Sequence, residues 1–494
     1  MTQVAWPGGG SDARAPAPAG AGHPHVVVIV LDELPVASVM RRDGLVDAAT
    51  MPNLARLASD GTWFRNATTT DEFTKLVMPS LLAGRYRRNL PDDGRVPNLF
   101  TMLRPTHDIR ANDGSPSSCP LADCMGNPDP SGLDLGAAGR EFAHNERGAP
   151  FVAFVRGIRA SDEPALHYVH LVMPHSPWRY LRSGQQYDAS SPVPGEWDAP
   201  GPGRAWRRQP WLVAQAYQRH LMQVQFVDEL LGVVLTRLED AGLYDASAIV
   251  LTADHGIAFA PGRPKRAATR ATAAEIAAVP LLVKRPFQAD ARVSDLPVEL
   301  VDVVPTIAHV VGVARPGGVD GKSVFGGRIS RRRARSIAGL SIDPDGLRTR
   351  RVVRAKYAAF ASGGVVDPFR LAPGTRESLL GVPVEDLDVD AARTFTATVE
   401  SYEAHVAAGP DDDLFPSLLE GTMTGDGAGR RRVLAIAVGG RVAAVTKTYR
   451  DGDAQRFYAM TPPTAYAEPP NEIALYALDQ DDPERAYAVR IRSR

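Results

Sequence analysis

The sequence predicts an α/β domain with a mostly parallel sheet, followed by a smaller part that is rich in β-strands. Two apolar runs, Val26–Leu31 and Ala248–Thr252, are short and continuous, as strands in the middle of a parallel sheet are. Between them, apolar residues recur at helical spacing over 224–238, and this pattern stops at Gly242, just before the second run. A helix that leads straight into a buried strand is typical of a sheet covered by helices.

The composition is that of a large globular chain. With 494 residues, of which 44% are hydrophobic, it can bury a sizeable core and is expected to hold two domains. A net charge of −1 argues against a general nucleic-acid binder. No segment reaches the roughly 20 apolar residues that cross a bilayer, and residues 1–22 lack the apolar core of a signal peptide. The location is therefore open, and both an extracytoplasmic placement and association with a membrane surface are compatible with the sequence.

Acidic residues follow both predicted strands. Asp32 and Glu33 end the first, and Asp254 and His255 end the second, with Gly256 turning the chain away. Because the carboxyl ends of parallel strands meet at one edge, these groups are expected at a common crevice. Carboxylates with one imidazole suit a divalent ion such as Mg, Mn, Ca or Zn. The alternative is a set of solvated strand ends, and Glu33 can join the site only if the chain leaves strand geometry before it.

A helix and a threonine-rich segment follow the first strand. Thr50 as cap, Pro52 in the first turn and Gly61 as stop delimit the helix. The segment then reads Thr-Thr-Thr-Asp-Glu-Phe-Thr74-Lys75 and continues to Pro-Ser-Leu-Leu-Ala-Gly84-Arg85.

The order of these motifs resembles the sulfatase branch of the alkaline phosphatase superfamily. In sulfatases a Cys-x-Pro-Ser-Arg motif precedes a Leu-Thr-Gly, and the cysteine is oxidised to formylglycine. Counting back from Gly84 places the nucleophile position on Thr74, where formylglycine cannot form. Threonine at this position is similar to lipoteichoic acid synthases and phosphoethanolamine transferases, which implies that Thr74 is nucleophile and metal ligand. Other hydroxyls compete for this role: Thr68, Thr69, Thr70 and Ser80.

The resemblance also implies residues that contact an anionic substrate. A predicted strand over 166–172 ends in Pro-His175-Ser-Pro, and this histidine is expected to act as hydrogen-bond donor or general acid. Lys75 and the basic loop with Arg263 and Lys265 are expected to bind the substrate, with a solvated basic loop as the alternative. Two histidines within the strand, His167 and His170, are expected to be core residues with at most a supporting role.

The chain is divided into four parts by these patterns. Residues 1–22 are expected to be disordered, and 23–326 form the alkaline-phosphatase-like catalytic domain. Residues 327–430 form a basic linker and mixed connecting region, and 431–494 a β-rich domain that starts with a hairpin around Gly439-Gly440. Cys119 and Cys124 are compatible either with a disulfide or with two free thiols.

These expectations favour a metal-dependent hydrolase or phosphotransferase that cleaves a phosphoester through Thr74. Its substrate would be an anionic small molecule or a polymer of the cell envelope. The alternatives are a sulfate-ester hydrolase and a catalytically weakened protein that binds anionic envelope polymers. A binding protein has no need for Asp32, Thr74, Asp254 and His255 together, so the enzyme is favoured.

Overall fold

The computed structural model describes residues 22–91, 96–114, 142, 145–187, 205–326, 335–337, 339–342, 346–374, 376–390, 394–425, 429–479 and 485–493. The expected disorder of residues 1–21, the redox state of Cys119 and Cys124, and most of the basic run at 328–335 lie outside the described residues. Among the described residues, no helix combines the length and the apolar character needed to cross a bilayer.

A seven-stranded sheet forms the centre of the N-terminal part, in the order β3-β4-β1-β5-β6-β2-β7. Strands β3, β4, β1 and β5 run parallel, and β6 is antiparallel to its neighbours β5 and β2, which confirms the mostly parallel sheet. The bounds are β1 (Val26–Asp32), β2 (Thr62–Phe64), β3 (Asp108–Asp113), β4 (Ala165–Pro174), β5 (Ala248–Ala253), β6 (Leu281–Lys284) and β7 (Arg292–Ser294).

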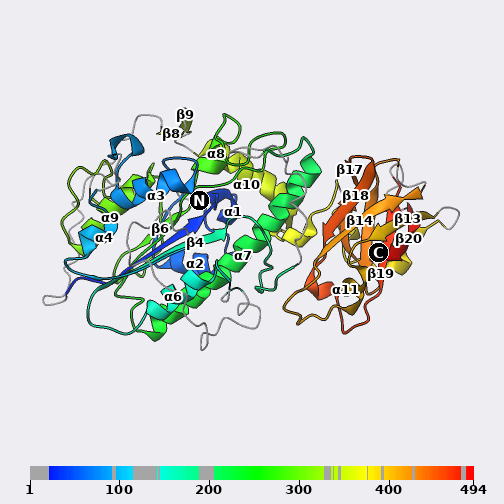
Figure 1. Ribbon diagram of the computed structural model, residues 1–494, viewed down its shortest axis with the longest axis horizontal. Helices are drawn as coiled ribbons and strands as arrows, with labels where there is room; N and C mark the ends of the chain where they lie inside the picture. Colours follow the sequence, from blue (N-terminus) through cyan, green and yellow to red (C-terminus); the bar gives the residue numbers. More distant parts are fainter. Residues whose placement is uncertain are drawn as a thin grey trace.

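Helices cover this sheet in two groups, which Figure 1 shows on either side of it. One group is α2 (Pro52–Ser59), α6 (Ala149–Gly157) and α7 (Pro210–Asp240), and the other is α3 (Thr74–Ala83), α4 (Leu99–Leu103) and α9 (Val303–Val311). Side chains of β1 such as Ile29 and Leu31 pack with Val224 and Leu231 of α7 in one apolar core. Burying such a side chain contributes about 1.5–3 kcal/mol, which fixes the sheet against α7.

Helix α7 is longer than the amphipathic pattern predicts. It begins with Pro210 at a position where proline is tolerated, because no intrahelical N–H partner is needed there. It continues for 31 residues and is followed by Gly242, whose φ of +68° suits glycine. The chain then enters β5, so this helix positions the strand that precedes Asp254.

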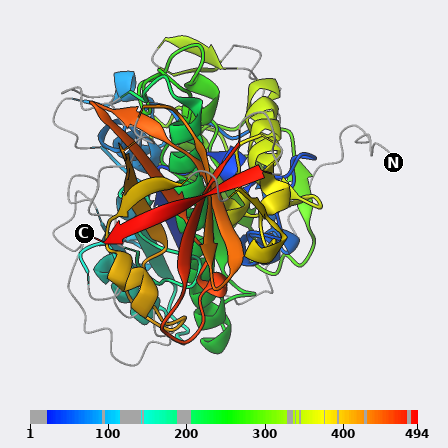
Figure 2. The same cartoon turned by 90° about the vertical axis from the view of Figure 1, so that its right-hand side faces the viewer.

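The C-terminal part is a second, antiparallel-rich sheet, seen face-on in Figure 2. Its strand order is β16-β15-β19-β20-β13-β14-β18-β17, with β12 pairing β20. The bounds are β12 (Asp388–Val389), β13 (Phe395–Val399), β14 (Leu418–Thr424), β15 (Val433–Val438), β16 (Arg441–Lys447), β17 (Tyr449–Asp451), β18 (Ala454–Met460), β19 (Ile473–Leu478) and β20 (Arg485–Ser493). The hairpin at Gly439-Gly440 is confirmed, and both glycines have positive φ. The sheet starts at β12, earlier in the chain than residue 431.

The connecting region contains one long helix that packs on the N-terminal part. This helix, α10 (Leu347–Phe360), lies against the short helices α1 (Val36–Val39) and α8 (Ala273–Ala277). The smaller elements are β8 (Arg335–Ile337), β9 (Leu340–Ile342), β10 (Ala361–Ser362), β11 (Val365–Val366) and α11 (Tyr402–Ala407). Buried Lys356 of α10 donates hydrogen bonds to the carbonyl oxygens of Ser38 (3.1 Å) and Met40 (2.9 Å), at the end of α1.

Lys356→Met is expected to remove a pH-dependent part of the stability. Burial lowers the pKa of Lys356 in the folded chain to about 8, from an ordinary value of 10.5. Between these values the unfolded chain binds a proton that the folded chain does not. The contribution of Lys356 to stability therefore rises with pH, by up to about 1.4 kcal/mol per pH unit. Thermal unfolding at about pH 8 and about pH 10 measures the rise.

The matched control is Lys322→Met, at an exposed lysine. The melting-temperature difference between wild type and Lys356→Met should change over this interval, while the difference for the control stays constant. A constant difference for Lys356→Met would contradict the assignment.

Candidate active site

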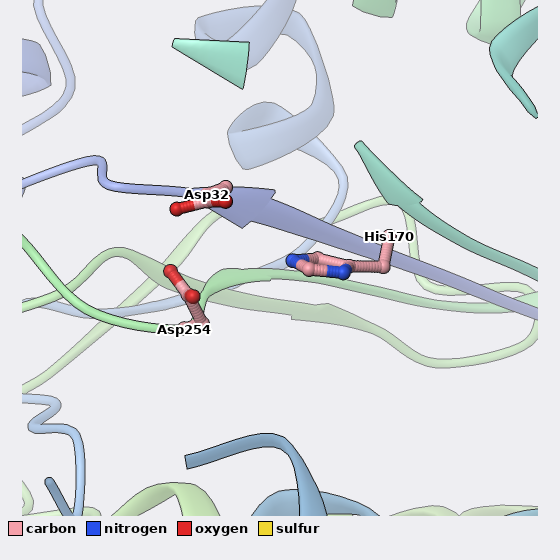
Figure 3. A group of neighbouring side chains, drawn as sticks. All are labelled: Asp32, His170 and Asp254. Carbon is pink, nitrogen blue, oxygen red and sulfur yellow. The ribbon is translucent and has the colours of Figure 1, made fainter. Parts of the chain in front are cut away.

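Three buried side chains meet at the carboxyl ends of the central strands. Asp32 ends β1, His170 lies near the end of β4, and Asp254 directly follows β5. Each offers one ligand atom, and these atoms lie within 4.8 Å of one another. Figure 3 shows the imidazole of His170 pointing towards the two carboxylates. We call these three residues the acidic cluster.

The acidic cluster is short of positive charge. Among the described residues, Oδ1 of Asp32 and Oδ2 of Asp254 have no hydrogen-bond partner, although both residues are at most 4% exposed. Burial and the neighbouring carboxylate of Asp254 together raise the pKa of Asp32. Buried carboxylate oxygens without donors are costly unless a cation satisfies them. The donor set of two carboxylates and one imidazole fits a divalent metal ion.

Asp113 orients the imidazole of His170 within the acidic cluster. The imidazole Nδ1 donates to Asp113 Oδ1 at 2.9 Å, and Asp113 is its register partner on β3. Burial by itself lowers the pKa of His170, but Asp113 and the cluster carboxylates raise it overall. A carboxylate behind a ligating histidine fixes its tautomer in this way. His170 was expected from the sequence to be a core residue with at most a supporting role, because it lies inside an apolar strand, and nothing in the sequence pointed to Asp113.

The other histidine of β4, His167, is a buried core residue, as expected from the sequence. It faces away from His170 on β4, stacks on His25, and burial lowers its pKa to about 3. Position along the strand could have distinguished the two histidines. His170 lies nearer the carboxyl end of β4 than His167, on the opposite face of the strand, and reaches the acidic cluster.

Thr74 lies beside the acidic cluster as the first residue of α3. Its Oγ1 is 3.3 Å from Nε2 of His255. The other ring nitrogen, Nδ1, lies 3.0 Å from the carbonyl oxygen of Gly256, so we place the proton on Nδ1 and an acceptor lone pair on Nε2. Burial alone lowers the pKa of His255, but the carboxylates of Asp254 and Asp32 outweigh burial and raise it. His255 can therefore accept the proton of the Thr74 hydroxyl.

The other hydroxyls that were candidates for the nucleophile have no described contact with His255. Thr68 donates to the carbonyl oxygen of Val298 and Ser80 to that of Leu76, at 3.3 Å in each case. The hydroxyls of Thr69 and Thr70 are buried and have no hydrogen-bond partner within the described part of the chain. Thr74 is the member of this group that is bonded to the histidine after β5.

Glu33 leaves strand geometry but turns away from the acidic cluster. Its φ is +68°, and the register of β1 with β4 shifts between Leu31 and Asp32. Its backbone N–H donates to Asp254 Oδ1 at 3.1 Å, while its carboxylate pairs with Arg266. Although burial favours the neutral form, His175 and Arg266 lower the pKa of Glu33 well below its ordinary range. The structure therefore does not bring Glu33, predicted as a metal ligand, into the group of ligand atoms.

His175 forms the basic side of the site together with two arginines. Its Nε2 contacts the guanidinium of Arg266, and its Nδ1 lies 2.5 Å from the carbonyl oxygen of Ser176. Arg147 donates to the carbonyl oxygens of His175 (3.0 Å) and Ser176 (2.7 Å), which holds this turn in place. The neutral ring therefore carries its proton on Nδ1 and accepts from Arg266 at Nε2.

The predicted substrate-binding cations are placed less directly. Lys75 and Arg263 are exposed, whereas Lys265 is 6% exposed and its carbonyl oxygen accepts from the Ala258 N–H. Arg266 is the residue of the basic loop that contacts Glu33 and His175. The sequence showed that this loop is basic, but it did not show which of its cations points into the site.

Gly256 is required where the chain turns after His255. A Cβ at this position would lie 2.1 Å from the carbonyl oxygen of Glu275. The Gly256 N–H donates to the carbonyl oxygen of Ile276 at 2.8 Å, which packs the turn against helix α8. This close approach explains why a glycine follows Asp254 and His255.

Part of this chain is similar to known proteins. Residues 148–313 match the family model described as Sulfatase. Arylsulfatase K of Danio rerio is 32% identical over 98 residues, which cover 20% of this chain and 18% of the relative. The chain thus aligns with less than a fifth of that relative's length.

Two solved structures are similar at lower identity. The phosphonate monoester hydrolase of Agrobacterium radiobacter is 17% identical, with a TM-score of 0.46 and coverage of 63% of this chain and 79% of its own. A putative sulfatase from Bacteroides thetaiotaomicron VPI-5482 is also 17% identical, with a TM-score of 0.44 and coverage of 61% and 74%. The matched segment 148–313 includes His170, His175, Asp254, His255 and Arg266. These five site residues therefore lie in the segment that is similar to the Sulfatase family model.

Proposed function

We propose that this chain is a metal-dependent hydrolase or phosphotransferase that cleaves a phosphoester through Thr74. The observation that carries the proposal is the contact of Thr74 Oγ1 with His255 Nε2, beside two buried carboxylates, Asp32 and Asp254, each of which has one oxygen without a hydrogen-bond partner among the described residues. A hydroxyl, a proton acceptor and a site for a cation are the parts that a nucleophilic threonine needs.

Asp32, His170 and Asp254 would hold the metal ion, whose identity among Mg, Mn, Ca and Zn is left to measurement. Bound there, it would polarise the ester and favour the ionised form of the nearby hydroxyl. This assignment replaces Glu33 by His170 in the ligand set expected from the sequence, and it leaves Thr74 and His255 beside that set.

The proton moves from Thr74 to His255 in the first step. As the bond between Thr74 Oγ1 and phosphorus forms, the bond to the leaving oxygen breaks and that oxygen takes the Nε2 proton of His175, which enters the step as the imidazolium. In the second step a water or an alcohol attacks phosphorus and gives its proton to His175. Thr74 leaves with the proton returned by His255, so both histidines end as they began.

Arg266 gives the site its affinity for an anionic substrate. The guanidinium now lies between the Glu33 carboxylate and His175 Nε2. Moving to the oxygens of a bound phosphoryl group would exchange one anionic partner for another and would free His175 Nε2 to take up a proton from water, which gives the imidazolium. Arg147, which holds the backbone of this turn, keeps His175 in place during the exchange.

Threonine favours phosphorus over sulfur. A formylglycine releases sulfate by collapsing back to its carbonyl form, and threonine has no such route. A phosphothreonine, in contrast, can be resolved by in-line attack on phosphorus. A sulfate-ester hydrolase is the second candidate function, favoured by the match to a protein named Arylsulfatase K.

His170→Ala is expected to lower the amount of divalent metal bound to the purified protein severalfold, because it removes one of three ligands. Elemental analysis by mass spectrometry of wild type and variant measures this amount. His167→Gln, on the opposite face of the same strand, is the control and should bind as much metal as wild type. Equal metal content in His170→Ala would remove His170 from the ligand set.

Thr74→Ala is expected to abolish turnover while preserving the fold and most of the bound metal, because it removes the attacking oxygen alone. Thr70→Ala serves as the control, since this nearby hydroxyl has no described contact with His255. Turnover and near-ultraviolet circular dichroism are measured on both. If Thr74→Ala retains full activity, the nucleophile is another group.

The wild type is expected to hydrolyse p-nitrophenyl phosphate or bis(p-nitrophenyl) phosphate much faster than p-nitrophenyl sulfate. The activity should disappear with a chelator and return with a divalent cation, since the acidic cluster would lose its cation. Release of p-nitrophenol, followed by absorbance, compares the substrates under one condition. A metal-dependent preference for the sulfate ester would select the second candidate, and no turnover of any ester would point to a binding protein.

A further inference from the structure

The side chain of Glu72 joins two segments that carry groups of the proposed active site. Its Oε2 accepts a hydrogen bond from the backbone N–H of Ala268 at 2.6 Å, across 196 positions of the chain. Glu72 lies two residues before Thr74. Ala268 lies two residues after Arg266, whose guanidinium pairs with Glu33. The bond therefore connects the segment of the proposed nucleophile to the loop of the arginine that is expected to bind the phosphoryl group.

On the side of the nucleophile, Glu72 directly precedes the start of α3. The next residue, Phe73, has an extended backbone at the N-cap position. Its carbonyl oxygen accepts from the N–H groups of Leu76 at 2.8 Å and Val77 at 3.0 Å, in the first turn of the helix. Because Phe73 is fixed to this turn, the backbone of Glu72 cannot shift without moving the start of α3 and the Thr74 hydroxyl with it.

On the side of the arginine, the basic loop, which spans 259–268, is held near both ends by carboxylates. At its start the N–H of Phe259 donates to Oε2 of Glu275, a residue of α8, at 2.9 Å. At its end the N–H of Ala268 donates to Glu72. Arg266 lies close to this second bond, so the Glu72 carboxylate fixes the part of the loop from which the guanidinium projects.

The negative charge of Glu72 calls for an explanation beside an anion-binding site. A carboxylate repels a phosphoryl group, so an acid two residues before the nucleophile works against substrate binding. The same charge strengthens the bond to an N–H, and a distance of 2.6 Å fits a charge-assisted hydrogen bond. The side chain is half-buried, which limits the competition from water for this bond. The contact with Ala268 therefore accounts for a carboxylate at this position.

We propose that Glu72 is a positioning residue that sets the distance between the Thr74 hydroxyl and the guanidinium of Arg266. This inference rests on the proposed function, in which the hydroxyl attacks phosphorus while the guanidinium holds the phosphoryl oxygens. Both groups act on one phosphoryl group, so an error of about 1 Å in their separation costs on the order of 10²-fold in rate. Glu72 acts through these two groups and takes no part in the proton transfers.

The test compares Glu72→Ala, which removes the acceptor, with Glu72→Gln, which keeps an acceptor oxygen without the charge. Asp71→Asn is the matched control, because it removes the charge of the neighbouring acid and keeps the oxygen that accepts from the Glu72 N–H. Three properties are measured on the full chain loaded with a divalent cation. They are hydrogen exchange of the peptide that contains Ala268, kcat and KM for p-nitrophenyl phosphate, and the affinities for orthovanadate and inorganic phosphate.

Orthovanadate separates a positioning role from a general loss of structure. Its five-coordinate form resembles the transition state of phosphoryl transfer, so tight binding needs Thr74 and Arg266 at the correct distance from each other. Inorganic phosphate resembles the ground state and can be held by Arg266 alone. A distorted protein would bind both anions more weakly, whereas a change in the distance between the two groups weakens orthovanadate selectively.

Glu72→Ala is expected to speed exchange at Ala268 and to lower kcat on the order of 10²-fold, with KM changed by about twofold at most. Its affinity for orthovanadate should fall by about tenfold or more, while that for phosphate stays nearly unchanged. Glu72→Gln should recover most of each loss, and Asp71→Asn should behave as wild type. In Arg266→Ala, the additional change Glu72→Ala should lower kcat little further, because the group that it positions is gone.

The outcomes distinguish this proposal from the proposed function. Full kcat and full orthovanadate affinity in Glu72→Ala would overturn the positioning role and leave the proposed function standing. Equal losses in Glu72→Ala and Glu72→Gln would also overturn it, since the charge and not the bond would then matter. A wild type that binds orthovanadate but cleaves no ester would remove the proposed function, and the orthovanadate comparison would still decide the role of Glu72. A wild type that does neither would overturn both.

Discussion

The repulsion between the buried carboxylates of Asp32 and Asp254 is the constraint on which the site depends. Two acids that are at most 4% exposed and share a pocket cannot both stay ionised without positive charge nearby. The fold compensates part of the negative charge through the backbone N–H groups of Glu33 and His255, which donate to Asp254 Oδ1, and through the dipole of the His170 imidazole that Asp113 orients. The remaining charge is what a divalent cation would bring. The parallel strands are arranged so that all of these groups emerge at one edge of the sheet.

A second group of charged side chains lies next to the acidic cluster, and its cation is paired within the group. Glu33, His175 and Arg266 form a contact set in which the acid compensates the arginine. The unusual backbone of Glu33, with φ at +68°, separates its carboxylate from that of Asp32, one residue earlier. One tight turn after β1 thus directs the carboxylate of Asp32 to the acidic cluster and that of Glu33 to Arg266 and His175. The two carboxylates stay apart although they are adjacent in the chain.

The sheet and several site residues were predictable because their signals are local. Apolar runs that end in acids marked β1 and β5, whereas Thr74, which lies beside His255, was selected through the resemblance to sulfatases by counting back from Gly84. The role of His170 was not predictable from its neighbours, because it depends on Asp113 of another strand. The inward turn of Arg266 and the separation of Glu33 depend on backbone geometry and on partners about 230 residues away in sequence. Such long-range partners leave no periodic pattern.

Helix α7 unites both sheets in one mechanical unit. Its 31 residues span about 46 Å, from the hydrogen bonds of Trp211 and Gln215 on the C-terminal sheet to the turn before β5. Gln215 is 1% exposed, so without that sheet a buried amide and its aromatic neighbour would face water. The C-terminal sheet is therefore needed to cover the start of α7. A replacement of this sheet during evolution must keep the surface that contacts the first two turns of α7, whereas the rest of the sheet is free to diverge.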